Sequence, residues 1–466
     1  MTEIDLLSAR EATDYFGSWL AFRREHLRVP GIQAAFLLGD TVIFEGAYGL
    51  ADQESGVDLT GNHLFRIASH SKTFTATAIL QLVEQGLLRL DDTVGAWLPY
   101  LVEASSPLAE ITIRELLAHG GGVVRDGADG DHWQLLQPFP DAQGLEHISV
   151  QPDVAVTPPN ETFKYSNIGY GLLGGVIERA SGQTYAAYVQ EHILDVLALK
   201  ETGPELRRDR LPDFATGYSS LAYAPHRAPI EHVDTRAMAA ATGFYSTARD
   251  LVTYFAGHFL GDERLLTDRS KRQMQQQQWQ TNPNKDRGGA YGLGLSLTPL
   301  GERTLIGHGG GYPGHITSSL ADPVDRFAVC VLTNAIDGPA QECVQAAVHL
   351  LDLALKSPRP DQDLDLVRFT GRFADLWGVV DVTVLGGRLW MMLPTDGNPA
   401  AEAIELVVVD EHTLRMQGGS GYGSAGEPVL FTFDADGRVS SMRGGSGVTR
   451  VPLSDFRLPS RVTVVG

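Results

Sequence analysis

Cysteine is nearly absent from the sequence, and the histidines are scattered. Of 466 residues only Cys330 and Cys343 are cysteines, and they do not have CxxC spacing. This excludes a disulfide framework and a zinc ribbon. Cys330 lies in the apolar run "FAVCVLTN" and is expected in the core. Metal-ligand spacing is also lacking among the histidines, which include His119, His132, His226, His232 and His315. We therefore expect neither a metal nor another cofactor.

Long hydrophobic runs are also missing. No stretch reaches the roughly 18 apolar residues that a helix needs to cross a bilayer. The first residues, "MTEIDLLSAREATDYF", have neither the basic start nor the apolar stretch of a signal peptide. The sequence therefore predicts a cytoplasmic protein without a membrane partner.

Positive charge is scarce as well. The chain has 37 lysines and arginines against 57 acidic residues, a formal net charge of −20. This balance argues against a nucleic-acid backbone or an anionic membrane as partner. Only six residues are lysines, so a lysine inside a motif is seldom there by chance. The remaining composition, 43% hydrophobic and 8% aromatic, is that of a soluble globular protein with about two to three domains.

The first half of the chain begins with a helix and a hairpin. The capping-box spacing of Ser8 and Glu11 predicts a helix that runs to about Leu27. The apolar runs "IQAAFLL" and "TVIFEGA" are joined by Gly39-Asp40, which indicates a two-residue hairpin. From Thr73 to about Val252 the pattern favours helices and long loops, including "FTATAILQLVEQGLL" and "IGYGLLGGVIERA".

Strands return after about Leu293. "GLSLTPL" and "RTLIGHG" are joined at Gly301-Glu302, and "HITSSLA" and "FAVCVLT" follow before a last helix at about 340–356. Strands on both sides of a helical insertion predict an α/β protein of the α+β kind rather than alternating βαβ units. We expect an antiparallel sheet flanked by helices, with an all-helical subdomain over about 73–252.

A domain boundary is predicted at 357–363, which is polar and contains prolines. Residues 1–356 would form the main domain. Residues 364–466 contain short alternating segments with Gly, Asn and Asp turns, which predict a small closed β-barrel. The glycine-rich stretch "GGSGYGSAG" at 418–426 does not match the G-x-S-x-G nucleophile pattern and is interpreted as a barrel loop.

The stretch "RIASHSKTFTATAIL" places Ser69 and Lys72 three residues apart at a predicted helix start. Side chains at this spacing share one face of a helix, so the lysine can reach the serine hydroxyl. Helix N-termini favour developing negative charge, and a desolvated lysine has a lowered pKa and can accept the hydroxyl proton. The ordinary alternative is that Ser69 or Ser71 caps the helix while Lys72 is solvated.

Two further stretches favour the catalytic interpretation. "TFKYSNIGYG" contains Tyr165 and Asn167, and "LIGHGGGYPGH" contains His308 followed by three glycines at the end of a predicted strand. Alone, each has an ordinary explanation: a core tyrosine, an asparagine that caps a helix, and a turn. A glycine-rich strand edge, however, lets a carbonyl group approach backbone donors closely, which a side chain at Gly310 would obstruct.

Taken in this order, the three stretches resemble the S-x-x-K, Y-x-N and K/H-x-G elements of the serine β-lactamase and penicillin-binding-protein superfamily. The resemblance is broadest to the class C β-lactamase-like branch, with D-aminopeptidases, D,D-carboxypeptidases and family VIII esterases. It covers about 29–355 and includes "ITIRELLAHGGG", "TGFYSTARDL" and "YGLGLSL". The tail, with "FTGRFADLWG" and "FDADGRV", is similar to the lipocalin-like barrels of several family peptidases.

The resemblance implies a catalytic set. Ser69 would be the acylated nucleophile and Lys72 the base that takes its proton. Tyr165 would complete the relay and protonate the leaving group. The oxyanion would lie between the backbone N–H groups of Ser69 and Gly311, and loss of one such donor typically costs about 3 kcal/mol.

The resemblance also implies substrate-binding residues. Asn167 would donate a hydrogen bond to a substrate amide, and His308 and Gly310 would line the opposite wall of the site. His315, seven residues after His308 across a Pro-Gly turn, is expected to line the mouth of the site.

Three features depart from the family pattern. His308 stands where β-lactamases and D,D-carboxypeptidases usually have lysine, and histidine is largely neutral above about pH 7. The segment "LLAHGGGV" replaces the more usual "LLTHTSGL", and no export signal is recognised. These departures favour aminopeptidase, amidase or esterase relatives over a β-lactamase or a carboxypeptidase.

The sequence therefore predicts a serine hydrolase that forms an acyl-enzyme with a small ester, amide or peptide. The alternatives are an acyltransferase that uses the same serine, a β-lactamase, and a non-catalytic binding or assembly module. The partner is expected to be a small molecule, and a homo-oligomer is compatible with the resemblance.

Overall fold

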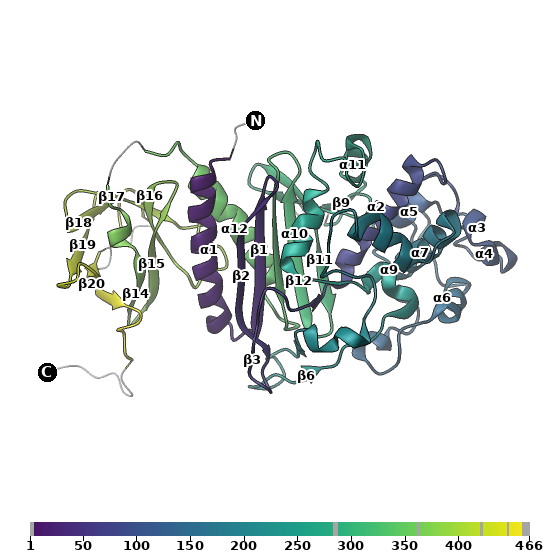
Figure 1. Ribbon diagram of the computed structural model, residues 1–466, viewed down its shortest axis with the longest axis horizontal. Coiled ribbons are helices and arrows are strands. Elements are labelled where there is room, and N and C mark those ends of the chain that lie inside the picture. Colours follow the sequence, from purple (N-terminus) through teal and green to yellow (C-terminus); the bar gives the residue numbers. More distant parts are fainter. Residues whose placement is uncertain (1–3, 283–287, 361–363, 420–422, 445–446, 459–466) are drawn as a thin grey trace. The chain divides into compact units, whose positions relative to one another are not determined.

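The computed structural model describes residues 4–282, 288–360, 364–419, 423–444 and 447–458 (Figure 1). The chain divides into two compact units, residues 29–344 and residues 1–28 together with 345–466. The domain boundaries expected from the sequence, at 1–356, 357–363 and 364–466, stay predictions. Part of the expected linker, 361–363, lies outside the described residues, as do 420–422 of the glycine-rich stretch.

The unit of residues 29–344 is built on an antiparallel sheet. All of its strand pairs are antiparallel, which confirms the predicted sheet type. In spatial order the nine strands are β3 (Val57–Asp58), β2 (Thr41–Asp52), β1 (Gly31–Leu38), β13 (Phe327–Thr333), β12 (His315–Asp322), β11 (Arg303–Tyr312), β10 (Ser296–Leu300), β9 (Ala290–Tyr291) and β8 (Trp279–Gln280).

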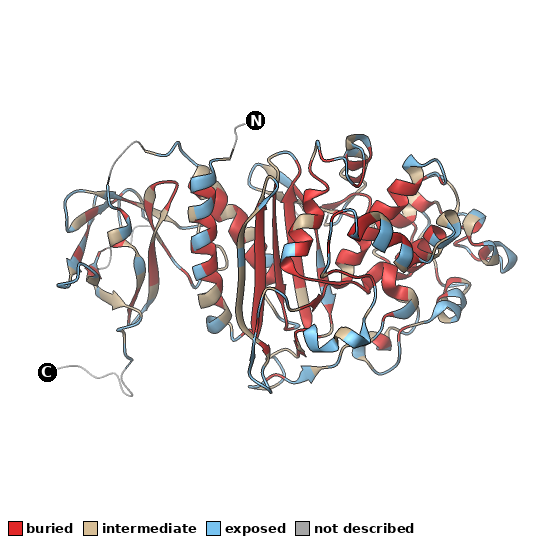
Figure 2. Cartoon of the chain, viewed as in Figure 1, coloured by how far each residue is buried: buried red, intermediate tan, exposed pale blue. Residues whose placement is uncertain are grey.

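The two predicted hairpins of this sheet are confirmed. Gly39-Asp40 joins β1 to β2, and Gly301-Glu302 joins β10 to β11. The first glycine of each turn has a positive φ, +60° at Gly39 and +59° at Gly301, which glycine adopts without steric cost. The central strands β1 and β13 are buried almost along their whole length (Figure 2), and Cys330 lies in this core as predicted.

Helices cover the sheet and form the predicted helical region. In that region α2 (Ser71–Glu84) packs against α7 (Asn167–Ser181) and α9 (Ala239–Thr242), while α10 (Ala248–Ala256) packs on β1 and β13. The other helices of this unit are α3 (Val94–Trp97), α4 (Pro99–Glu103), α5 (Ile113–Leu117), α6 (Ala142–Ser149), α8 (Tyr185–Val189) and α11 (Asp268–Met274). Two-residue strands interrupt the region, namely β4 (Phe65–Arg66), β5 (Gly217–Tyr218), β6 (Pro229–Ile230) and β7 (Tyr245–Ser246).

The second unit combines the first helix, most of the last helix and a barrel. The helices are α1 (Leu6–His26) and α12 (Ala340–Leu355), and Tyr15 of α1 donates a hydrogen bond to Asp381 of the barrel. The prediction that Ser8 and Glu11 cap α1 is wrong. Asp5 is the N-cap, and its carboxylate accepts from the Leu7 and Ser8 N–H groups. Aspartate caps as well as serine does, and it lies three residues earlier.

The predicted β-barrel is confirmed. Eight antiparallel strands close on themselves, so the barrel has no free sheet edge. The strands are β14 (Gly371–Asp375), β15 (Gly378–Leu385), β16 (Arg388–Met392), β17 (Ile404–Val408), β18 (Thr413–Met416), β19 (Pro428–Phe433), β20 (Val439–Arg443) and β21 (Thr449–Pro452). Across the described parts of the chain, no helix combines the length and the apolar character that a membrane crossing requires.

Candidate active site

Ser69 lies in a single 3-10 turn, Ala68–His70, directly before α2. Ala68 has a φ of +44°, an uncommon backbone conformation for a residue other than glycine. Ser71 donates its hydroxyl to the Ala68 carbonyl and accepts from the Phe244 N–H, and no side chain caps α2. The alternative interpretation, in which a serine caps the helix and Lys72 is solvated, is therefore wrong, because Lys72 has no exposed surface.

The amine of Lys72 is held by three oxygen atoms. Nζ donates to Ser69 Oγ at 3.2 Å, to Asn167 Oδ1 at 2.7 Å and to the Ala241 carbonyl at 2.8 Å. None of these three acceptors is a carboxylate. The acceptors lie on the 3-10 turn, on α7 and on α9, so the packing of α2 against α7 and α9 fixes the lysine beside the serine hydroxyl.

Burial gives Lys72 an unusual titration. Loss of hydration lowers the pKa of the Lys72 amine well below its ordinary value, because burial penalises the charged form. The carboxylate of Asp126 acts in the opposite direction and raises the pKa, and the nearby guanidinium of Arg125 lowers it. The neutral amine that this favours has two N–H groups, which Asn167 Oδ1 and the Ala241 carbonyl can accept. Its lone pair is then left for Ser69 Oγ, whose proton it can take.

Tyr165 completes the contacts of the serine. Its hydroxyl donates to Ser69 Oγ at 2.8 Å, and Lys72 Nζ lies 4.8 Å from the centre of its ring. The tyrosine immediately precedes Ser166, whose side chain caps α7 by accepting from the Gly169 N–H. Burial raises the pKa of Tyr165, so its hydroxyl keeps its proton at neutral pH. The three predicted catalytic side chains therefore lie together.

Asn167 links the lysine to Asp126, which the sequence did not single out. Asn167 is 2% exposed, and its Nδ2 donates to Asp126 Oδ1 at 2.7 Å while its Oδ1 accepts from Lys72. The carboxylate accepts only, so it fixes which end of the amide faces the lysine. The predicted bond from Asn167 to a substrate stays a prediction.

The glycines of β11 lie against the turn that carries Ser69. A Cβ placed on Gly310 would be 2.1 Å from the Ile67 carbonyl oxygen, so no side chain fits there. Gly311 is exposed, and an added Cβ would meet only Ile316 Cδ1, at 3.6 Å. The close packing on Ile67 is a structural reason for glycine at position 310. The predicted approach of a substrate carbonyl to these glycines stays a prediction. The assignment of the oxyanion to the N–H groups of Ser69 and Gly311 stays a prediction.

His308 is buried and neutral. Its Nδ1 donates to the Gly309 carbonyl at 2.6 Å, so its Nε2 accepts from the Tyr291 hydroxyl at 3.0 Å. Burial, together with the nearby Lys72, lowers the pKa of His308 to about 3. The ring is 6% exposed, and it supplies no positive charge to a substrate at neutral pH.

His315 differs from its expected position. The sequence predicted it at the mouth of the site, but it has no exposed surface. Its ring lies 5.6 Å from that of Phe65 and 5.3 Å from that of His232. The side chain therefore packs against Phe65 of β4, and most residues of β12 are buried as well. This buried position does not support the predicted substrate-binding role of His315.

The segment "LLAHGGGV" folds around His119, whose contribution the sequence did not reveal. Nδ1 of His119 accepts from the Ser166 N–H at 3.1 Å, and its ring lies 4.2 Å from that of Tyr165. Gly122 has a φ of +69°, and a Cβ there would be 2.0 Å from the Thr157 carbonyl oxygen.

Gly122 is the glycine that the usual family pattern also has, whereas Gly120 and Gly121 depart from it. A Cβ on Gly120 would be 2.9 Å from Trp279 Nε1, and one on Gly121 would be 2.9 Å from Ile111 Cγ2, so both departing glycines are closely packed.

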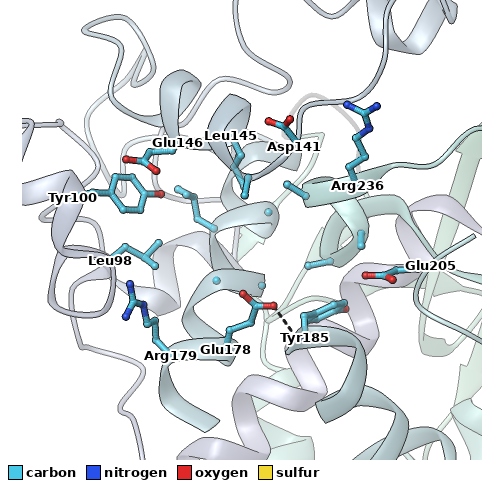
Figure 3. A pocket seen from close by; sticks show the side chains of 18 residues that line it. Leu98, Tyr100, Asp141, Leu145, Glu146, Glu178, Arg179, Tyr185, Glu205 and Arg236 are labelled. Atoms are coloured by element: carbon cyan, nitrogen blue, oxygen red, sulfur yellow. Dashed lines mark hydrogen bonds between the residues drawn. The ribbon is translucent and has the colours of Figure 1, made fainter. Parts of the chain in front are cut away.

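A separate pocket of about 470 Å³ lies against α7 and α9 (Figure 3). None of the predicted site residues lines it. Its labelled charged side chains are Asp141, Glu146, Glu178, Arg179, Glu205 and Arg236, all exposed. Within the described residues, no group of three or more His, Cys, Asp or Glu side chains could hold a metal ion.

The fold and the site define a class of protein. The chain has an antiparallel sheet flanked by helices. A serine and a lysine lie at the start of a buried helix, and a tyrosine hydroxyl contacts the serine. This is the arrangement of β-lactamase-like serine hydrolases. The chain belongs to the Beta-lactamase family, whose model matches residues 18–354.

Two proteins of similar sequence illustrate the range of that family. Penicillin-binding protein 4* of Bacillus subtilis (strain 168) is 28% identical over 323 residues, 67% of this chain and 70% of that protein. Esterase EstB of Burkholderia gladioli is 33% identical over 190 residues, 38% of this chain and 47% of the esterase. The chain thus spans less than half of the esterase's length.

Among solved structures, the D-amino acid amidase from Ochrobactrum anthropi SV3, complexed with L-phenylalanine amide, has a TM-score of 0.61 and is 26% identical. The similarity covers 74% of this chain and 99% of the amidase.

Proposed function

We propose that this serine hydrolase cleaves small esters or amides through an acyl-enzyme on Ser69. One observation carries the proposal: Ser69 Oγ contacts both a buried lysine amine and a tyrosine hydroxyl, at 3.2 and 2.8 Å. A serine hydroxyl is a weak nucleophile until an adjacent base takes its proton. The names of the relatives, an esterase and an amidase among them, agree with this substrate class.

In acylation, the neutral amine of Lys72 takes the proton of Ser69 as Oγ attacks the carbonyl carbon of the substrate. The oxyanion that forms receives hydrogen bonds from backbone N–H groups at Ser69 and Gly311. When the bond to the leaving group breaks, Tyr165 gives its proton to the departing oxygen or nitrogen and recovers one from Lys72. Water then attacks the acyl-enzyme and gives a proton to Lys72, and Lys72 passes that proton to Ser69 Oγ as the bond to the acyl group breaks.

The first test is pre-steady-state kinetics with p-nitrophenyl acetate, together with D- and L-aminoacyl p-nitroanilides. We expect a burst of p-nitrophenol equal to the enzyme concentration, and a mass increase of the protein by one acetyl group. Ser69→Ala and Lys72→Ala should each lower kcat by several orders of magnitude, because the two residues act as a unit. Turnover near that of the wild type in either variant would contradict the proposal.

The same assay separates the alternatives. An acyltransferase would show release of the acyl group to an added alcohol in preference to water. A β-lactamase would hydrolyse a chromogenic cephalosporin at a rate comparable with the esters. A non-catalytic module would show neither a burst nor a trapped acyl group.

A further inference from the structure

His119 holds the backbone on both sides of the reactive tyrosine. Its carbonyl accepts from the Lys164 N–H at 2.8 Å, and its Nδ1 accepts from the Ser166 N–H at 3.1 Å. These two donors belong to the residues directly before and after Tyr165. One histidine therefore fixes the short segment whose middle side chain donates its hydroxyl to Ser69.

The ring of His119 is confined by other aromatic rings. It is 2% exposed, and its centre lies 4.2 Å from that of the Tyr165 ring. The rings of Tyr291 and Tyr170 are next, at 4.9 and 5.1 Å. Because interiors are close-packed, a ring held by three neighbours cannot turn away without displacing them. The acceptor that meets Ser166 is therefore kept in place.

The backbone of His119 indicates that its side chain has a task. His119 follows α5, where the Gly120 N–H donates to the Glu115 carbonyl and the His119 N–H donates to the Leu116 carbonyl. This pair of bonds ends a helix with a left-handed residue, which is most often glycine. His119 has a φ of +60° at this position. Glycine would adopt that conformation at no steric cost, so a histidine here favours a functional contact over a plain helix end.

The histidine is not itself a base of the site. Because its Nδ1 accepts from the Ser166 N–H, the proton of the neutral ring is on Nε2. Burial, together with the nearby Lys72, lowers the pKa of His119 well below its ordinary value, so the ring stays neutral. Within the described residues, neither ring nitrogen makes a hydrogen bond with Ser69 or Lys72. Any effect of His119 on the chemistry therefore passes through Tyr165.

We propose that His119 is a positioning residue that holds the Tyr165 hydroxyl where it gives its proton to the leaving group. This inference rests on the proposed function. Proton transfer needs hydrogen-bond distance, and Tyr165 has that distance to Ser69 Oγ, 2.8 Å. If the bond to Ser166 is lost, the segment shifts and the transfer slows. The loss falls on substrates whose leaving group needs this proton, whereas a leaving group that departs as an anion is little affected.

The test is a series of phenyl acetates that share the acyl group and differ in the acidity of the leaving phenol. His119→Leu is similar in size and has no acceptor for the Ser166 N–H. It should lower kcat/KM about 10- to 100-fold for p-methoxyphenyl acetate and at most about threefold for p-nitrophenyl acetate, whose phenol is more acidic. His119→Asn should stay close to the wild type on both esters. Asparagine tolerates a positive φ, and its Oδ1 takes the place of the histidine Nδ1.

A double-mutant cycle with Tyr165→Phe distinguishes positioning from a general loss of structure. If His119 acts through the tyrosine hydroxyl, His119→Leu should change kcat/KM by less than about twofold once that hydroxyl is gone. His258→Leu is the matched control, since it removes another histidine without exposed surface. We expect it to lower the thermal midpoint and to leave the ratio of kcat/KM between the two esters unchanged.

Equal losses on the two esters, or losses that add in the double variant, would overturn the proposal. So would a His119→Asn variant as slow as His119→Leu, since the bond to Ser166 would then not be what holds the tyrosine. If His119→Leu does not fold, His119→Gln, which has no acceptor at the Nδ1 position, gives the same comparison with the same expected result. Failure of the proposed function looks different: no ester is cleaved in a Ser69-dependent way, and no acetyl group is trapped on the serine.

Discussion

Lys72 is the residue on which the chemistry depends. It has no exposed surface, and its amine contacts a hydroxyl, an amide oxygen and a backbone carbonyl, none of which is an anion. Without a carboxylate in contact, burial dominates and lowers the pKa of this amine. A lysine in this state can serve as a base near neutral pH, which a solvated lysine cannot.

The pH dependence of activity follows from this lysine. Because catalysis needs the neutral amine, kcat/KM should rise with pH through the lowered pKa of Lys72, well below the usual range of lysine. The carboxylate of Asp126 raises that pKa, so Asp126→Asn should move the acid limb to lower pH while its amide still accepts from Asn167. The measurement is kcat/KM from pH 4 to 10. Asp129→Asn, in the same loop, is the control, and an acid limb that does not move in Asp126→Asn would refute the electrostatic coupling.

His308 should take no part in titration near neutral pH. Its pKa is about 3, so it is neutral from pH 5 to 8. His308→Gln should lower activity, since the hydrogen bond with Tyr291 changes, yet keep the position of the acid limb of the pH profile. The check is the same pH series as for Asp126→Asn. If a limb near pH 6.5 disappeared in the variant, His308 would be a titrating group of the site.

The sequence predicts which reactive side chains meet, but not the residues that orient them. Ser69 and Lys72 have helical spacing, and Tyr165 follows from the resemblance. Asp126 and Arg125 lie in the irregular segment "VVRDGADG", where no periodicity reveals which side chain will face the site. Their contacts depend on the docking of that segment on α7, which is a long-range event.

At the scale of the element, the glycines of β11 place backbone without side chains next to the turn that carries Ser69. Gly310→Ala should lower kcat/KM strongly, because the new Cβ would overlap the Ile67 carbonyl oxygen and push the strand from the turn. Gly309→Ala is the matched control: a Cβ at this adjacent residue would meet only the Thr317 carbonyl oxygen, at 3.7 Å. We expect it to keep most of the activity and the thermal midpoint of the wild type. Equal activity of the two variants would contradict the close packing of β11 on this turn.

Elements with strong local signals are predicted accurately. The hairpins at Gly39 and Gly301 and the last helix follow from turn residues and apolar periodicity, which act over a few residues. The predicted start of α1 was wrong because Asp5 and Ser8 are both good N-cap residues, and local spacing does not decide between them. His315 was misplaced because a turn sequence does not show which face of the next strand is covered.

At the scale of the whole molecule, the unit of residues 29–344 buries several neutral histidines. Burial lowers the pKa of His70 and of His232 to about 4, and that of His258 to about 3. The unfolded chain binds protons at these groups below about pH 6.5, while the folded chain does not. Their contribution to stability is therefore complete above pH 6.5 and is lost as pH falls toward 4. A shift from 6.5 to about 4 corresponds to about 3 kcal/mol.

The expected result is a marked fall in the free energy of unfolding between pH 7 and pH 5, measured by urea titration. Replacing one of these groups, as in His258→Gln, should make that fall smaller. His26→Gln, at an exposed position of α1, should not change it. An unfolding free energy that is constant over this range, or a slope that His258→Gln leaves unaltered, would contradict the account.

The order of folding units along the chain was accessible from composition and patterning alone. An antiparallel sheet, a helical insertion and a C-terminal barrel each have their own repeat of apolar residues, and all three are present. The grouping of α1 with the barrel unit was not foreseen. The bond between Tyr15 and Asp381 joins residues 366 positions apart, and no local pattern predicts it.

The central claim is that Ser69 is a nucleophile activated by a neutral Lys72. Its most direct test is reaction with a fluorophosphonate, followed by intact-mass measurement and peptide mapping, over a range of pH. We expect one adduct per chain, on Ser69, formed much more slowly in Lys72→Ala and absent in Ser69→Ala. An adduct on another residue, or equal labelling rates with and without the lysine, would contradict the claim.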